Sequence, residues 1–214
     1  MQCIHYFSRS HISYYIYKLN KGDTIVYPAY QSPKQLFMIL NGLIYLSKVF
    51  NHKQYLSLAI LGKNNIIDVG SETHIYHQYY YSLTAIQTTY LISIKDTELK
   101  NKINSLLFQH ILISYKLTLY KYEQMNKILI HKYSKYRLLQ LLLFLFTEFG
   151  HITKQTIHMP YIMSKKQISI IIGCNINTVN YILKTYDPYI NIKKINKKFI
   201  YIQNIRIFIK SYCI

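Results

Sequence analysis

Amide side chains gather between lysines in the last third of the chain, over residues 165–184. Asparagine can bond adenine through two hydrogen bonds, and an aliphatic side chain can touch the methyl group of thymine. Lysine contacts phosphate without reading sequence. These residue types therefore predict contact with A·T base pairs in a DNA major groove. The predicted contacts on this segment are Lys165, Lys166, Asn175, Ile176, Asn177, Thr178, Asn180, Tyr181 and Lys184.

Such contacts need one presented helix face, and residues 164–186 have the pattern of two short helices joined at Gly173. Ser164 can cap the first helix with Gln167 as its capping-box partner. Gly173 allows a sharp turn because it has no Cβ. Small Ser169 lets the helices cross closely, and the positions predicted to be buried are Ile168, Ile171, Ile172, Val179, Ile182 and Leu183. The spacing is typical of a helix-turn-helix, although a helical hairpin in a core shares it.

A basic hairpin is predicted after Pro188, where YINIKK and KFIYIQ flank a turn at residues 195–197. A hairpin beside a helix-turn-helix is a wing, and its lysines lie along the phosphate backbone. The alternative is a solvated edge on which lysines prevent strand pairing between molecules. The predicted phosphate contacts are Lys193, Lys194, Lys197 and Lys198.

The charge of the chain is strongly positive and uneven. The 214 residues contain 26 Lys and Arg against 8 Asp and Glu, a net charge of +18. Residues 135–214 hold 12 basic and 2 acidic residues (+10), which leaves +8 for residues 1–134. A charge of this size favours a polyanionic partner. Because the 24 tyrosines could stack on bases, a general RNA-binding or ribosome-associated protein is the alternative to a double-stranded DNA binder.

Residues 14–95 are predicted to form strands, since short apolar runs alternate with turn signals. Many short strands of this kind indicate an antiparallel barrel or jelly roll. Asn41-Gly42 is the strongest hairpin signal, because both residues tolerate positive φ. The last strand is expected to run through Tyr80–Ile94.

A helical period replaces the strand period over residues 98–132, which contain neither Gly nor Pro. Apolar positions at alternating spacings of 3 and 4 predict a coiled-coil seam and hence a parallel homodimer. Such a dimer would set two recognition helices on half-sites about 34 Å apart. The alternative is a helix that packs on its own barrel. The predicted seam is Phe108, Ile111, Tyr115, Thr118, Tyr122, Met125 and Leu129.

The predicted fold class is therefore α+β, in three parts. An antiparallel β-roll occupies residues 1–105, a dimerisation helix residues 106–134, and a winged helix-turn-helix residues 135–214. The last part begins with a helix over 135–150 that ends at Gly150. A short strand over 155–159 follows it.

This order resembles that of the Crp/Fnr family of transcription regulators. The resemblance rests on KGDTIV (21–26), LFMILNGLIYLSKVF (36–50), SLAILGKNNIIDV (57–69), KYRLLQLLLFLFTEFG (135–150) and MSKKQISIIIGCNINTVNYILK (163–184). It implies a cyclic-nucleotide-binding type of β-roll and a non-enzymatic homodimer on a palindromic promoter site. RNA polymerase would be a further partner. Within the family the chain is most similar to the global nitrogen regulator of cyanobacteria and plastids. The Ile-, Lys-, Asn- and Tyr-rich composition suits an A/T-rich genome, so we expect a plastid-encoded protein of the chloroplast, or otherwise one of the bacterial cytoplasm.

The resemblance also locates an effector pocket at Asp68, Val69, Tyr79, Tyr80, Thr118 and Glu123. Cyclic-nucleotide binders of the family hold phosphate with an arginine that is absent from residues 66–85, so no cAMP binding is expected. The nitrogen regulators bind 2-oxoglutarate through two arginines, and the corresponding positions here are Tyr79 or Tyr80 and Thr118. Lys116 or Lys121 could hold a dicarboxylate instead. We therefore predict no cofactor, with 2-oxoglutarate as the ligand that the family would suggest.

Metal-dependent and nucleophilic chemistry find little support in the sequence. Glu72, His74 and His77 form an E-x-H-x-x-H group, but strand alternation places His77 on the opposite face, so no metal site is predicted. His52, His74 and His77 are candidate haem ligands of a gas sensor, but surface histidines are the expected case. No nucleophile triad or Gly-rich phosphate loop is recognisable. The longest apolar run, Leu138–Phe146, is too short to cross a bilayer, so no membrane partner is expected.

Overall fold

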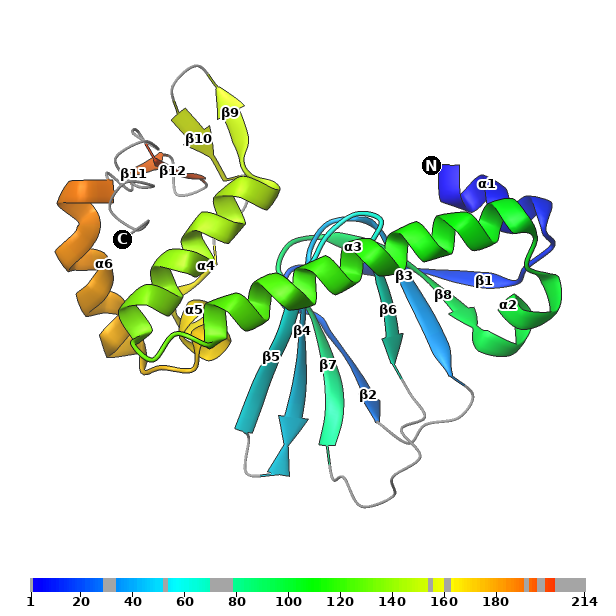
Figure 1. The fold of residues 1–214 in the computed structure, drawn as a ribbon, viewed down its shortest axis with the longest axis horizontal. Helices are drawn as coiled ribbons and strands as arrows, with labels where there is room; N and C mark the ends of the chain where they lie inside the picture. Colours follow the sequence, from blue (N-terminus) through cyan, green and yellow to red (C-terminus); the bar gives the residue numbers. More distant parts are fainter. Residues whose placement is uncertain are drawn as a thin grey trace. The chain divides into compact units, whose positions relative to one another are not determined.

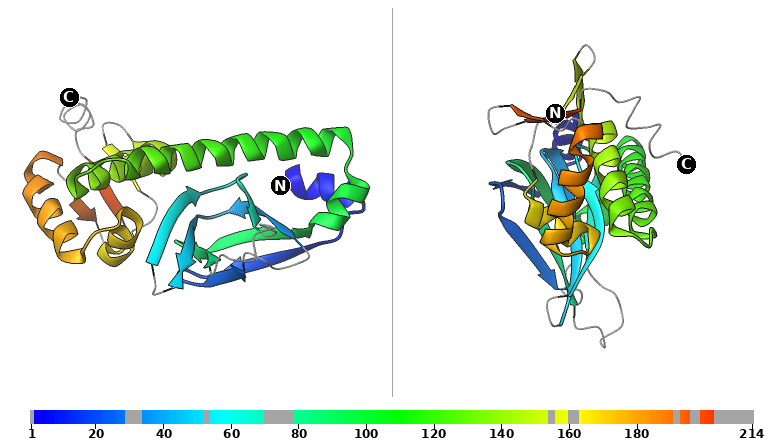
Figure 2. Two further views of the ribbon diagram at one scale, coloured as in Figure 1. Left: turned by 60° about the horizontal axis from the view of Figure 1, so that its bottom comes forward. Right: turned by 90° about the vertical axis from the view of Figure 1, so that its left-hand side faces the viewer.

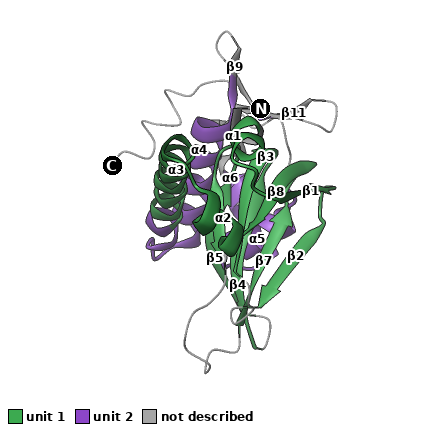
Figure 3. Cartoon of the chain, turned by 90° about the vertical axis from the view of Figure 1, so that its right-hand side faces the viewer, with its two compact units in different colours: residues 1–125 green, residues 126–214 purple. Residues whose placement is uncertain are grey.

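The computed structural model describes residues 2–28, 34–51, 54–69, 79–153, 156–159, 163–190, 193–195 and 199–202 (Figure 1). The chain divides into two compact units, Met1–Met125 and Asn126–Ile214 (Figure 3). Both units mix helices and antiparallel strands, which confirms the α+β class. The described helices include none that is long and apolar enough to cross a membrane.

Eight strands lie in the described part of the first unit, and they bear out the prediction of strands over residues 14–95. They lie in two antiparallel sheets with the orders β1-β8-β3-β6 and β2-β7-β4-β5, which is the arrangement of a jelly roll. The strands are β1 Tyr14–Leu19, β2 Thr24–Pro28, β3 Gln35–Asn41, β4 Ile44–Phe50, β5 Gln54–Leu61, β6 Ile66–Val69, β7 Tyr79–Ala85 and β8 Thr89–Lys95.

Two turn predictions in this unit were wrong. Asn41-Gly42 does not close a hairpin, because β3 pairs with β8 and β6 whereas β4 pairs with β5 and β7. The chain crosses from one sheet to the other at Gly42, whose φ of 101° and close approach to Thr89 exclude a side chain. The segment predicted as one strand over Tyr80–Ile94 is two strands, β7 and β8, separated by a bend at residues 86–88.

The main core lies between the two sheets, and a second core lies on the outer side of the first sheet. The first contains Phe37, Ile39, Leu46, Leu61 and Leu83, all nearly inaccessible to solvent. Alternate residues of β3 and β8 point the other way into the second core, which also receives helix side chains. Its members include Leu36, Met38, Ile92 and Ile94 from the sheet, Phe7 from α1 (Gln2–Arg9), and Leu107 and Ile111 from α3 (Ser105–Leu129).

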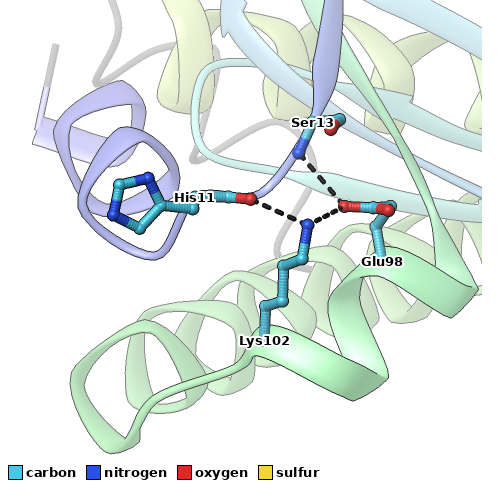
Figure 4. Close-up of polar contacts among 4 residues, drawn as sticks. All are labelled: His11, Ser13, Glu98 and Lys102. Atoms are coloured by element: carbon cyan, nitrogen blue, oxygen red, sulfur yellow. Dashed lines mark hydrogen bonds and ion pairs between the residues drawn. The ribbon is translucent and has the colours of Figure 1, made fainter.

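A polar cluster fixes the connection between α1 and β1 to α2 (Asp96–Lys102) (Figure 4). The ammonium of Lys102 lies 2.8 Å from the carboxylate of Glu98 and donates to the carbonyl of His11 at 3.0 Å. The amide of Ser13 donates to the same carboxylate at 3.4 Å. Helix α1 and this cluster had no counterpart among the sequence predictions.

The predicted long helix over residues 98–132 is interrupted at Ile103-Asn104, so α2 and α3 are separate. Helix α3 lies along the sandwich, with its inner side turned to the sheets (Figure 2). Its buried positions follow spacings of 4 and 3, as in a coiled coil, but they are covered by the chain's own residues. They are Leu107, Ile111, Ser114, Thr118, Lys121, Met125 and Ile128.

This packing changes the predicted dimer seam. Three of its members, Ile111, Thr118 and Met125, are already buried within one subunit. Thr118 also joins α3 to the free edge of β6 by hydrogen bonds. Its hydroxyl accepts from the amide of Ile66 at 2.9 Å, and its proton is shared between the carbonyls of Ile66 at 2.9 Å and Ser114 at 3.0 Å. The alternative of a helix packed on its own barrel therefore applies to this face, and any partner must use another one.

The second unit contains α4 (Ser134–Phe149), α5 (Lys165–Ile172) and α6 (Ile176–Ile190), and α4 packs against both of the others. Gly150 follows α4 as predicted, but with extended dihedrals (φ −78°, ψ 151°) instead of left-handed ones. A four-stranded antiparallel sheet has the order β11-β12-β10-β9. Its strands are β9 His151–Thr153, β10 Thr156–His158, β11 Lys193–Ile195 and β12 Phe199–Ile202.

Candidate nucleic-acid interface

Helix α5 begins with the predicted capping box. The hydroxyl of Ser164 accepts from the amide of Gln167 at 3.1 Å, and the side chain of Gln167 accepts from the amide of Ser164 at 2.8 Å. This exchange satisfies two amides that helix geometry leaves unpaired. Ile168, Ser169, Ile171 and Ile172 are buried, as predicted. The cap therefore fixes where α5 starts and which face it buries.

The turn to α6 also follows the prediction. Gly173 adopts a left-handed conformation, with φ 63° and ψ 50°. Asn175 then caps α6: its side-chain oxygen accepts from the amide of Asn177 at 2.9 Å. The side chain predicted as a base contact is thus occupied at its oxygen, and a purely structural cap explains its residue type. Val179 and Ile182 are buried, as predicted, while Leu183 is half-buried.

One exposed stripe runs along α6 opposite its buried side. Asn177, Tyr181 and Lys184 stand at spacings of 4 and 3, so they lie on a single helix face. Tyr181 is 71% exposed, and Ile176 in the first turn is also exposed. The stripe offers an amide, a phenol and an ammonium, the kinds of group that contact base edges and phosphate. The structure thus brings three of the predicted contact residues onto one face, and Ile176 is exposed on a neighbouring face.

Two predicted contacts lie on the flanks of this stripe. Thr178 and Asn180 are half-buried. The side-chain oxygen of Asn180 is buried and has no hydrogen-bond partner among the described residues. Only the amide nitrogen of Asn180 is left to reach a ligand, so the bidentate contact predicted for adenine is not available in this conformation.

The predicted phosphate contacts are only partly described. Lys165 and Lys166 are exposed in the first turn of α5. Lys193 and Lys194 belong to β11, which pairs antiparallel with β12 as the predicted hairpin requires, but their side chains lie outside the described residues. Lys197 and Lys198 lie outside them altogether. Their contact with phosphate stays a prediction.

Arg137 at the start of α4 is a residue that the sequence predictions missed. Its guanidinium donates to the carbonyls of His131 at 2.8 Å, Ile172 at 2.8 Å and Lys132 at 3.2 Å. Burial raises the pKa of the neighbouring Cys174 thiol, and the charge of Arg137 opposes that shift. The signal in the sequence was composition: arginine is rare in a chain whose other basic residues are almost all lysine.

The described residues of the predicted effector pocket have different surroundings. The hydroxyl of Thr118 holds Ile66 and Ser114, as described above. Asp68 is exposed on β6 and accepts from the hydroxyl of Tyr115 at 3.0 Å. Glu123 is exposed, and the side chain of Val69 lies outside the described residues. Burial, and then the charge of Asp68, raise the pKa of Tyr122 to about 12 and move the pKa of Tyr115 upward, so both phenols stay protonated at neutral pH.

Tyr79 and Tyr80 point to opposite faces of β7. Tyr79 is 6% exposed and packs edge-on against Tyr81, while Tyr80 is exposed. The ammonium of Lys48 lies 4.3 Å from the centre of the Tyr79 ring, which is a cation–π distance. A separate small cavity of about 210 Å³ is lined by Ser13, Tyr15, Gln35, Ser93, Lys95 and Glu98, none of which belongs to the predicted pocket.

The three residues of the E-x-H-x-x-H group, Glu72, His74 and His77, lie outside the described residues, as does His52. Among the residues that are described, no three His, Cys, Asp or Glu side chains are grouped as metal ligands would be. The described part of the chain thus adds nothing to the case for a metal centre.

Comparison with known proteins gives a likeness of fold. No family model and no curated protein matches the chain. A mutant of CooA from Carboxydothermus hydrogenoformans matches with a TM-score of 0.71 and 14% identity, over 93% of this chain and 88% of that chain. FixK2 from Bradyrhizobium japonicum matches with a TM-score of 0.68 and 16% identity, over 93% and 97%. A CRP/FNR-family transcriptional regulator from Thermus thermophilus matches with a TM-score of 0.66 and 15% identity, over 92% and 98%.

Proposed function

We propose that this chain, which shares the fold of a CRP/FNR-family regulator, is a DNA-binding transcription regulator whose helix α6 enters the major groove. The observation that carries the proposal is the exposed stripe of Asn177, Tyr181 and Lys184 on a helix that is capped at Asn175 and anchored by buried Val179 and Ile182. The net charge of +18 supports a polyanionic partner. In a helix-turn-helix the second helix of such a pair is the one that reads the bases.

Asn177 of the stripe and the exposed Ile176 in the first turn also support a preference for A·T pairs. Asn177 can bond N6 and N7 of adenine, and Ile176 can touch a thymine methyl. Lys184 stands at the far end of the stripe, where a phosphate contact fits a cation better than a base edge. A good base contact contributes about 1–3 kcal/mol of discrimination, so Asn177 would decide sequence and Lys184 would add affinity.

Selection from a pool of random duplexes tests this proposal. We expect a palindromic site rich in A·T, bound by a dimer. Asn177→Ala should weaken the selected site by about 1–3 kcal/mol and leave random DNA unaffected. Lys184→Ala should weaken all duplexes alike and lower the salt slope by about one unit. A monomer that prefers single-stranded RNA would refute the proposal in favour of the RNA-binding alternative.

A homodimer is part of the proposal, with a revised seam. Phe108, Leu112, Tyr115 and Leu119 form an exposed stripe of α3 at spacings of 4, 3 and 4, with Tyr122 as the next position. No charged residue interrupts it. A second exposed stripe, Leu106, Ile113, Leu117 and Tyr120, is interrupted by His110. We therefore assign the first stripe to the partner helix, which keeps Phe108 and Tyr115 of the predicted seam.

A pair of matched substitutions tests the seam. Leu119 is 69% exposed and Ile113 is 55% exposed, and they lie on opposite flanks of the same helix. Leu119→Glu should convert the dimer to a monomer in sedimentation or light scattering, since a carboxylate would be buried at the seam. Ile113→Glu should leave the dimer intact. A dimer that survives Leu119→Glu and dissociates in Ile113→Glu would move the seam to the other stripe.

An anionic effector would need a cationic side chain near the junction of the barrel and α3. Lys121 lies in the buried stripe of α3 and Lys116 is exposed, so Lys121 is the lysine that an enclosed anion would meet. The finer resemblance to the nitrogen regulators, together with a plastid origin and RNA polymerase as partner, is proposed from the sequence motifs. Measuring DNA affinity with 2-oxoglutarate and with cAMP tests it: we expect no effect of cAMP, and an effect of 2-oxoglutarate would support the nitrogen-regulator assignment.

A further inference from the structure

We infer that Arg137 is a positioning residue that fixes the start of the recognition helix α6 by binding the end of α5 to the segment before α4. The inference rests on the proposed function for its consequence in DNA binding, but its geometric basis does not. Arg137 joins three backbone carbonyls from two separate segments of the chain: His131 and Lys132 before α4, and Ile172 at the end of α5.

The chemistry of the contact suits arginine alone. The carbonyls at a helix C-terminus have no partner within the helix and carry its partial negative charge. Ile172 is the last residue of α5, and its carbonyl accepts from Nη1 of Arg137 at 2.8 Å. Nε and Nη2 reach the other two carbonyls at the same time. A lysine has one nitrogen at the end of a flexible stem and cannot hold this fork of directions.

The guanidinium also lies against the turn that starts α6. Its Nη1 is 3.6 Å from the position that a Cβ would occupy at Gly173. The connection over residues 173–175 is short, and Asn175 is already the cap of α6. The buried isoleucines of α5 and α6 attract one another without directional preference, whereas hydrogen bonds specify angle. Arg137 is thus the directional side-chain contact that joins this turn to the segment before α4, and it helps to set the angle at which α6 leaves the turn.

A rival role for Arg137 is a direct phosphate contact, and the two roles predict different results. A phosphate contact would contribute equally to all duplexes and to the salt slope. A positioning contact would change the placement of Asn177 and Tyr181 on the bases, so it would lower the affinity for the selected site more than that for random DNA. Each of the three nitrogens of Arg137 already donates to a carbonyl, which favours the positioning role.

Hydrogen exchange on the free protein tests the geometry without DNA. The amides of Gly173 and Cys174 donate to the carbonyls of Ile170 and Ser169 at the end of α5. In Arg137→Gln we expect both amides to exchange about tenfold faster or more, as loss of a charge-assisted hydrogen bond implies. The amide of Gln167, at the capped start of α5, is the internal reference and should keep its rate. Equal acceleration at both ends, or none at the turn, would overturn the inference.

DNA binding of the same variant tests the consequence. We expect Arg137→Gln to lower the ratio of specific to random-duplex affinity about fivefold or more, with an unchanged salt slope. Arg137→Lys keeps the charge and should also lower the ratio of specific to random-duplex affinity. It replaces the Gln variant in this test if that variant does not fold. Lys135→Gln removes an equal charge from the same helix turn and should change neither readout. A salt slope lower by about one unit with an unchanged ratio would make Arg137 a phosphate contact.

The two levels of the proposal fail separately. If the unsubstituted protein shows no preference among duplexes, the proposed function is wrong, while the exchange rates at Gly173 and Cys174 still decide the geometric claim. If the protein selects a site and Arg137→Gln keeps both the ratio and the exchange rates, the function stands and the positioning role is wrong.

Discussion

Replacing Thr118 by Val removes one hydroxyl and keeps the shape of the side chain. In the structure this hydroxyl accepts from the amide of Ile66 and donates to the carbonyls of Ile66 and Ser114, at distances from 2.9 to 3.0 Å. Ile66 is fully buried and begins β6, an edge strand of its sheet. The Val variant therefore leaves the amide of Ile66 without this acceptor beneath α3.

The cost follows from the number of groups affected. A buried backbone group that loses its partner costs about 1–3 kcal/mol, and two groups of Ile66 face Thr118, so we expect Thr118→Val to lower the free energy of unfolding by about 2–6 kcal/mol. Thr118→Ser keeps the hydroxyl and loses one methyl group, at about 1 kcal/mol. The difference in unfolding free energy between the two variants therefore measures the hydrogen bonds that join α3 to β6.

Urea unfolding followed by circular dichroism, at one protein concentration, measures both variants. The slope of free energy against urea should stay constant while the midpoint falls, and it should fall further in the Val variant. A Val variant at least as stable as the Ser variant would show that the Thr118 hydroxyl does not stabilise the contact between α3 and β6. Thr118 would then be available to an effector, as the resemblance to the nitrogen regulators implies.

Three further changes test other parts of the fold. In the same urea assay, Gly42→Ala should lower the free energy of unfolding by about 1–2 kcal/mol because φ is positive. Overlap of the new methyl group with Thr88 and Thr89 should cost about 1–3 kcal/mol more. Gly22 has a similar φ and open space around it, so Gly22→Ala should show only the cost of the positive φ. Ser164→Ala removes the capping box of α5 and should cost about 1 kcal/mol, read as a lower thermal midpoint that Ser164→Asp restores. The hydrogen bond from Lys102 lowers the pKa of Glu98, so this carboxylate stabilises the fold above its unfolded pKa and the contribution is lost as pH falls through the folded value. Glu98→Gln should therefore show a smaller drop in stability on acidification than the unsubstituted protein, and an unchanged drop would contradict the cluster.

The helix cap and the glycine turn of the candidate interface were predictable because their signals are local. Ser164 and Gln167 form a capping box within one helical turn. Gly173 adopts a left-handed conformation that a residue with a Cβ would disfavour. Residues this close in sequence meet in almost any compact fold. Asn175 shows the limit of such reasoning, since an asparagine before a helix suits both a cap and a base contact, and only the position of its side chain separates the two.

Helix α3 resisted prediction for a different reason. Apolar side chains cover most of its circumference, so spacings of 3 and 4 can be traced on several faces at once. The stripe that is buried includes Ser114 and Lys121, which hydrophobic periodicity would assign to solvent. Thr118 is buried because it satisfies the backbone of Ile66, a residue more than fifty positions earlier in the chain.

The amino-acid sequence by itself determined the strands of the jelly roll and the helix pair with its cap and glycine turn, because these depend on neighbours along the chain. It also determined the excess of positive charge, which follows from composition alone. Tertiary structure alone decided that Asn41-Gly42 joins two sheets, which face of α3 covers the barrel, and that Arg137 holds the end of α5. These outcomes depend on which distant groups share a buried surface. A backbone group that is buried must find a partner wherever the fold supplies one, and that partner is set by the arrangement of the whole unit.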